Sequence, residues 1–120
     1  MTDLDKLIEA VKSGTVTMPM ATACYPRDAK GRFKRETGAW SDGKVIDAYD
    51  GSLDAARWLH EALLPRCGWE IWRTFNHMPD GTSPLIYGCN LPRIDTAYAE
   101  NPARAWLLAV LTAVKAGAVQ

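Results

Sequence analysis

WEIWRTFNHMPDGTSPLIYGCNL, residues 69–91, is the stretch that decides the fold, because it predicts an antiparallel β-hairpin. Residues 69–76 and 85–91 are rich in aromatic and β-branched side chains, which favour a pleated strand. The Pro-Asp-Gly sequence at residues 79–81 is typical of a tight turn. We therefore expect the two strands to pair with each other across this turn.

The side chains of the first strand alternate between two faces. Trp69, Ile71 and Phe75 are expected on one face. Trp72 falls on the other face, since successive residues of a strand point to opposite sides. Large apolar groups on both faces predict a sheet that is covered on both sides.

Two helices are predicted ahead of the hairpin. Residues 2–13 place apolar side chains at helical spacing, and Gly14 then stops the helix. The second helix follows a turn at residues 50–52 and ends at Leu64, because Pro65 cannot continue it. We expect the inner face of this second helix to consist of Leu53, Ala56, Leu59, His60, Leu63 and Leu64.

The last helix, over residues 103–116, is predicted to begin after Asn101 and Pro102. Asn caps a helix well, and Pro fits the first helical position, where its missing N–H costs nothing. Only three residues of this segment are polar, and they fall in a narrow stripe. We expect this helix to be buried, either inside the fold or against a second copy of the chain.

The region between the first two helices is less regular. Pro and Gly residues interrupt residues 15–43, and we expect an irregular, basic segment with a loose hairpin that turns near Gly31. Residues 44–49 are predicted to form a strand, since Val45 and Ile46 favour a pleated surface.

The composition limits the class of protein. The 120 residues, 48% apolar and 23% charged, are typical of one globular domain over residues 1–120. The 14 basic and 14 acidic side chains balance, so no overall field attracts nucleic acid or an anionic membrane. The elements together predict an α/β (α+β) fold. In it a small, largely antiparallel sheet is covered by helices on both faces, as an α-β-α sandwich.

Four short runs carry a resemblance to a known family: residues 49–56, 64–65, 68–69 and 101–106. With the Ala/Leu-rich helix that follows, they resemble the phage ABA sandwich domain over about residues 45–116. The resemblance implies a small bacteriophage or prophage protein whose sheet has helices on both faces. It transfers no active site, because the shared positions are strand, cap and core residues.

Few side chains are suited to acid–base or metal chemistry. His60 lies at the edge of an apolar helix face, where a hydrogen-bonded core or boundary histidine is the expected role. His77 is expected to be a turn residue. Cys67, His77 and Cys89 match no zinc spacing and lack a fourth ligand. We therefore expect no metal site and no cofactor.

Three carboxylates, Asp47, Asp50 and Asp54, cluster near the end of the predicted strand. Paired acids at such an edge can bind Mg²⁺ or transfer protons. Structural roles explain them better, since Asp50 precedes Gly51 in a turn and Asp54 favours the start of a helix. The sequence also lacks a Gly-rich phosphate loop, a G-x-S-x-G elbow and an H-E-x-x-H motif. We expect a protein that is not an enzyme and has no catalytic residues.

A cluster of basic residues in the irregular segment suggests an anion or nucleic-acid site, with aromatic side chains for stacking. The alternative is a solvated loop, which the neutral charge of the whole chain favours. The candidate residues of this cluster are Arg27, Lys30, Arg32, Phe33, Lys34 and Arg35, with Tyr25 beside them.

Five tryptophans are many for this length, and aromatic residues and Arg are enriched at binding hot spots. Trp69 and Trp106 are expected in the core. Trp40 and Trp58, the latter beside the outward-facing Arg57, are candidate anchors for a partner protein. Packing under the irregular segment is the alternative for both tryptophans.

Cys24, Cys67 and Cys89 form an odd set without a C-x-x-C pair, which favours reduced thiols in a cytosol. Residues 1–5 do not resemble a signal peptide, and the longest apolar run, residues 106–111, is far shorter than the roughly 20 residues needed to cross a bilayer. We expect a protein of the bacterial host cytoplasm without a membrane partner.

These observations favour a phage accessory protein that binds a host or phage protein without catalysis, for example to inhibit a host defence system. One alternative is a nucleic-acid-binding protein that uses residues 27–35. Another is a structural phage component that forms a homodimer through its last helix.

Overall fold

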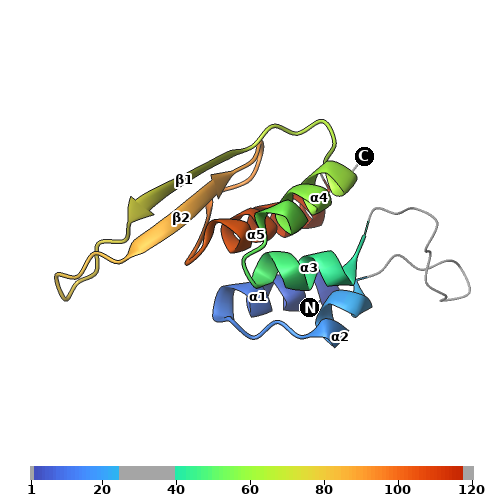
Figure 1. Ribbon diagram of the computed structural model, residues 1–120, viewed down its shortest axis with the longest axis horizontal. Coiled ribbons are helices and arrows are strands. Elements are labelled where there is room, and N and C mark those ends of the chain that lie inside the picture. Colours follow the sequence, from blue (N-terminus) through green and yellow to red (C-terminus); the bar gives the residue numbers. More distant parts are fainter. Residues whose placement is uncertain (1, 25–39, 118–120) are drawn as a thin grey trace, which may run out of the picture.

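The computed structural model describes residues 2–24 and 40–117, which form five helices and one three-stranded antiparallel sheet (Figure 1). The predicted α+β class and the predicted hairpin are confirmed. The helices are α1 (Asp3–Ser13), α2 (Met18–Ala23), α3 (Asp42–Tyr49), α4 (Leu53–Leu63) and α5 (Pro102–Lys115), and the strands are β1 (Glu70–Phe75), β2 (Leu85–Asn90) and β3 (Ala97–Ala99).

The sheet has the strand order β1-β2-β3, and β1 pairs with β2 along the full length of both strands. The loop between them continues the pairing, because the Asn76 N–H donates to the Pro84 carbonyl at 2.9 Å. Gly81 has a φ of 88°, in the left-handed region that favours glycine. The Asp80 carboxylate accepts the Thr82 N–H at 2.9 Å and so fixes the turn.

Side-chain hydrogen bonds cap the starts of α1 and α4. The Thr2 hydroxyl accepts the Asp5 N–H at 3.1 Å, and the Ser52 hydroxyl accepts the Ala55 N–H at 3.1 Å. Gly14 ends α1 with a φ of 77°, which is unfavourable for other residues. Local side-chain chemistry therefore sets the bounds of α1 and the start of α4.

The last helix, α5, is the centre of the fold. It contacts α1, α3, α4 and all three strands, and Leu107, Val110 and Leu111 are fully buried. The prediction of a buried last helix is confirmed, and its burial is inside the fold. One copy of the chain therefore covers the apolar surface that the homodimer alternative would use. Among the described residues, no helix has the length and apolar character that a membrane span requires.

One residue of the predicted inner face of α4 is placed differently. Leu53 is 46% exposed, whereas the five residues predicted beside it are buried. Leu53 is the first residue of α4, so it lies at the end of the helix, where less of the fold covers it.

Residues 44–49 belong to α3, so the predicted strand is wrong. Ser41 caps this helix, because its hydroxyl accepts the Lys44 N–H at 3.2 Å. Val45 and Ala48 lie three residues apart on one helical face, and both are fully buried. Burial of that face outweighs the β preference of Val and Ile.

The prediction of an irregular segment over residues 15–43 is corrected in part, because α2 lies within it. Pro19 stands in the first turn of α2, where a missing N–H breaks no helical hydrogen bond. The turn predicted near Gly31 lies outside the described residues.

The layers of the molecule run from the sheet to α5 and then to α1, α3 and α4 (Figure 1). The sheet face that carries Ile71, Tyr87 and Cys89 packs into the core against α5. The opposite face carries Trp72 and Tyr98, and Tyr98 is 51% exposed. The prediction that both faces are covered is therefore corrected, because the outer helices pack on α5 rather than across the sheet.

Candidate interaction surface

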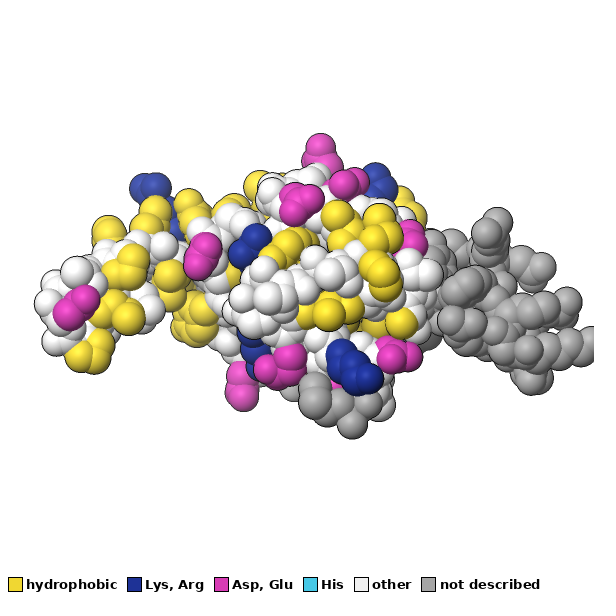
Figure 2. Space-filling model, turned by 90° about the horizontal axis from the view of Figure 1, so that it is seen from below, with side chains coloured by type: hydrophobic (Ala, Val, Ile, Leu, Met, Phe, Trp, Pro, Cys, Tyr) yellow, Lys and Arg dark blue, Asp and Glu magenta, His cyan; other side chains and the backbone are white. Residues whose placement is uncertain are grey.

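Eight large hydrophobic side chains of the described residues are exposed. Exposed apolar groups gathered in one region mark interaction sites more often than scattered ones do. Figure 2 shows such side chains on the hairpin, at the left of the view, as well as over the helices. Five of the eight belong to the sheet, its loop or the residue before β1, namely Trp69, Phe75, Met78, Leu85 and Tyr98, and the others are Met18, Leu53 and Trp58.

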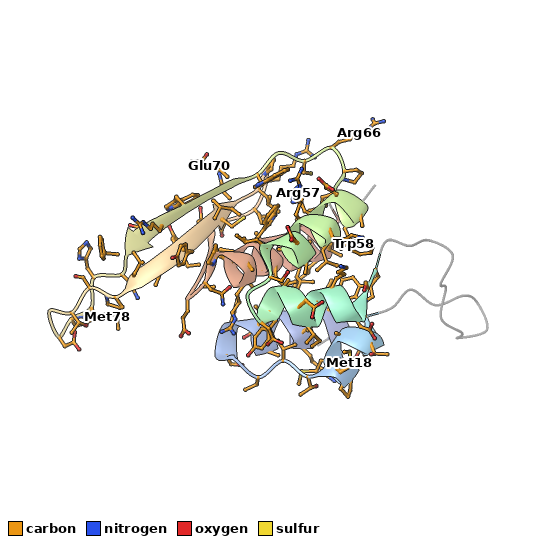
Figure 3. All side chains as sticks on the ribbon, in the orientation of Figure 1. Met18, Arg57, Trp58, Arg66, Glu70 and Met78 are labelled. Carbon is orange, nitrogen blue, oxygen red and sulfur yellow. The ribbon has the colours of Figure 1, made fainter. Side chains whose placement is uncertain are left out.

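The far end of the hairpin is an arm that extends beyond the helices (Figure 1). Phe75 and Leu85 are directly opposite each other in the ladder, and they are 58% and 41% exposed. They share a sheet face with the buried Cys89, at the end of the strands away from the core. Met78 adds a third side chain from the loop, 42% exposed (Figure 3). We call Phe75, Met78 and Leu85 the arm cluster.

The arm cluster was not singled out from the sequence. Phe75 alternates with its neighbours like any residue of a covered strand, so alternation alone predicts burial. The signal that the sequence does carry is the polar connection over residues 76–84, which is rich in Pro, Gly, Ser and Thr. A long polar connection lies at the surface, so the strand ends that adjoin it are also exposed.

The outer face of the sheet carries a second aromatic group. The Trp72 ring lies across Gly88, where an added Cβ would stand 2.7 Å from two ring carbons. Tyr98 meets Trp72 edge-on, with ring centroids 6.4 Å apart and planes at 89°. We call Trp72, Gly88 and Tyr98 the aromatic shelf.

The predicted anchors Trp58 and Arg57 both lie at the surface of α4 (Figure 3). Trp58 is 37% exposed, and the Lys44 ammonium lies 6.0 Å from its ring centroid. Arg57 forms an ion pair with Glu61 at 3.0 Å, one helical turn further along. Their exposure is confirmed, and their role in binding stays a prediction.

Trp40, the other predicted anchor, belongs to the core. It is 8% exposed, and its indole N–H donates to the Ala21 carbonyl at 3.0 Å. The alternative of packing under the segment of residues 15–43 is therefore confirmed for Trp40, because Ala21 of that segment accepts its hydrogen bond. The basic cluster of residues 27–35 lies outside the described residues.

His60 is a hydrogen-bonded core residue, as predicted. It is 1% exposed, and its Nδ1 accepts the indole N–H of Trp106 at 3.1 Å. Because an indole N–H only donates, the proton of the imidazole is on Nε2, which donates to the Cys67 carbonyl at 2.7 Å. Both ring nitrogens are therefore occupied in holding the segment before β1 to α5, and neither is free for proton transfer to a substrate.

Trp106 is 4% exposed, which confirms its predicted place in the core. Trp69 stacks on Trp106 with centroids 5.0 Å apart, yet it is 44% exposed. The prediction of a core Trp69 is therefore corrected: one ring face covers Trp106, and the side chain stands at the edge of the core.

The remaining candidates for chemistry do not converge. His77 is an exposed loop residue whose Nδ1 lies 3.1 Å from the Ser83 hydroxyl, as expected for a turn residue. Burial raises the pKa of the Cys24 thiol to about 11 and that of Cys89 to about 12, so both thiols are protonated at neutral pH. Across residues 2–24 and 40–117, no three His, Cys, Asp or Glu side chains are placed to share a metal ion.

The three carboxylates near the end of α3 are exposed. Asp50 is the C-cap of α3 and Asp54 lies in the first turn of α4, as predicted for structural roles. Asp47 is exposed as well, and its backbone carbonyl accepts the Ser52 N–H at 2.9 Å. All three carboxylates therefore lie at the surface around the junction of α3 and α4.

No family model, curated protein or solved structure matches this chain.

Proposed function

We propose that this chain is a non-catalytic binding protein that holds a partner protein against its hairpin arm. The observation that carries the proposal is the exposed pair of Phe75 and Leu85, directly opposite each other at the end of the ladder. A sheet that served only to cover α5 would not need large apolar side chains there.

The energy available at the arm cluster suits a binding hot spot. Burying the exposed part of each side chain contributes on the order of 1 kcal/mol, from about 25 cal/mol per Å² of apolar surface. Two of them, Phe75 and Leu85, stand on paired strands, so their backbone is already ordered before a partner binds. Hot spots have this form, a few apolar anchors at the centre of a larger interface.

We further propose that the partner is a protein of the bacterial host or of a phage, met in the host cytoplasm. The phage origin rests on the resemblance of residues 45–116 to the phage ABA sandwich domain. The free thiols of Cys24, Cys67 and Cys89 agree with a reducing compartment. Inhibition of a host defence protein is one role that such binding would serve.

Comparative capture from a bacterial lysate tests the proposal. The arm variant carries Phe75→Ser and Leu85→Ser. A matched control carries Met18→Ser and Leu53→Ser, at positions that are 47% and 46% exposed on the helices. Far-UV circular dichroism and thermal melting establish that all three proteins are folded.

The proposal predicts one specific partner that wild type and control retain and the arm variant loses. Retention of the same proteins by all three chains contradicts it, and so does a partner lost only by the control. Sedimentation of the purified protein tests whether a second copy of the chain occupies the arm. A doubled mass that the arm variant reverts would place another copy on the arm and contradict a separate partner.

A further inference from the structure

A hollow of about 320 Å³ lies beside β3, at the opposite edge of the sheet from β1. The end of α1, the end of α3 and the start of α5 surround it, and Figure 1 shows these three ends on one side of the molecule. Its charged and aromatic lining consists of Lys12, Tyr49, Tyr98, Glu100 and Arg104. The hollow is separate from the arm cluster and holds none of its residues.

Two contacts fix the Arg104 guanidinium within this hollow. Its Nε–H donates to the Tyr49 carbonyl at 3.1 Å, and its central carbon lies 4.1 Å from the Tyr49 ring centroid. These contacts leave the two terminal nitrogens for other partners, and within the described residues no carboxylate forms an ion pair with Arg104. A planar fork held in this way is organised in advance for a carboxylate or a phosphate, which it can bind with two parallel hydrogen bonds.

The charged residues that line the hollow are two cations, Arg104 and Lys12, and one anion, Glu100. Lys12 adds a second cation, and the start of α5 adds the partial positive charge of a helix N-terminus. Glu100 opposes them, as does the partial negative charge at the end of α1, where Lys12 stands in the last turn. Arg104 and Lys12 thus face Glu100 within the lining, and Glu9, outside the lining, forms an ion pair with Lys12 at 3.6 Å. Arg104 is therefore the cation of the hollow that no carboxylate of the described residues pairs with.

We infer that this hollow binds the anionic group of a small ligand or a peptide, a carboxylate or a phosphate, with the Arg104 fork as its main donor. Lys12 supplies the second charge. Tyr98 and Ala99 of β3 form the side of the hollow next to the sheet. The size of the hollow, at the lower end for ligand pockets, suits such a group.

NMR titration of the whole chain at constant ionic strength tests the inference. The probes are inorganic phosphate and N-acetylalanine, and the uncharged N-acetylalanine methylamide is the control. We expect saturable shifts of the Arg104 side-chain signal and of the amides of Gly14 and Glu100 at millimolar concentrations of at least one anion. Saturable shifts with phosphate alone would identify the ligand group as a phosphate. Saturable shifts with N-acetylalanine alone would identify it as a carboxylate. No saturable shift with either anion, or equal shifts with the methylamide, would overturn the inference.

Substitutions at three exposed side chains should change the affinity for the anion differently. Lys12→Gln should weaken binding about two- to fivefold, and Glu100→Gln should strengthen it by a similar factor, as for charge pairs in contact with solvent. Lys6→Gln, on the same helix but outside the hollow, should leave affinity unchanged. Affinity that is insensitive to both Lys12 and Glu100, or that falls with Glu100→Gln, places the anion elsewhere and contradicts the site.

Discussion

Substituting Gly88 by Ala should destabilise the sheet through a single contact, the Trp72 ring that lies across it. The added Cβ would stand 2.7 Å from Cε2 and Cζ2 of Trp72, well inside van der Waals contact. Either the ring moves off the sheet or the strands separate, and overpacking of this kind costs about 1 to 2 kcal/mol. Gly88 has no left-handed φ, so Ala fits its backbone, and only the ring opposes the change.

A double-mutant cycle isolates this contact. In a Trp72→Ala background the ring is absent, and Gly88→Ala should be neutral or stabilising by about 0.5 kcal/mol, because Ala loses less backbone entropy than Gly on folding. Urea unfolding followed by far-UV circular dichroism gives the four free energies. We expect a coupling energy of at least about 1 kcal/mol and a melting temperature that falls about 3 to 6 °C per kcal/mol. A Gly88→Ala variant as stable as wild type, or an equal cost in both backgrounds, refutes this description of the aromatic shelf.

Other changes test the packing and the charges. A hydrogen bond from Lys115 holds the pKa of Asp5 at about 2, against 3.8 ordinarily. The stability advantage of wild type over Asp5→Asn should therefore be present above about pH 4 and lost as the pH falls through about 2. A constant difference in unfolding free energy down to about pH 2, measured by urea denaturation at low salt, contradicts this. Cys89, whose pKa burial raises to about 12, should resist iodoacetamide in the native protein and react once urea unfolds it, and equal rates in the two states would show that it is not buried. His60→Phe should lower the unfolding free energy by about 1 to 3 kcal/mol, because it leaves the Trp106 N–H buried without an acceptor; if Trp106→Phe does not reduce that cost, the hydrogen bond is not its cause.

The starts of α1, α4 and α5 could be predicted from the sequence because their chemistry is local. A cap such as Ser52 or Asn101 acts on an N–H three residues away, and both do so here. The hairpin was predictable for the same reason, since its turn chemistry lies between two β-rich runs. By contrast, Val45 and Ile46 favour a strand by local preference, and only the burial of one face by the rest of the fold makes residues 44–49 part of α3. The cap at Ser41 was the local signal that pointed to a helix.

The candidate surface was less predictable because exposure depends on contacts between distant segments. The sequence makes Trp40 and Trp58 equal candidates for exposed anchors. In the structure Trp40 is buried and donates to the Ala21 carbonyl, whereas Trp58 lies at the surface. Whether Phe75 is covered depends on how far α5 extends beneath the hairpin. The residue pattern of the strand does not predict that distance. The hollow around Arg104 likewise forms only where the ends of three helices meet.

If the arm cluster is a free binding surface, the fold does not need its apolar side chains. The most direct test is the unfolding free energy of the Phe75→Ser, Leu85→Ser variant, measured by urea denaturation beside wild type. Phe75 and Leu85 are 58% and 41% exposed, so their cross-strand contact and partial cover should together contribute less than about 2 kcal/mol, and the variant should lie within that margin of wild type. A loss above about 2 kcal/mol would mean that Phe75 and Leu85 belong to the core, and it would contradict the account of a free binding arm.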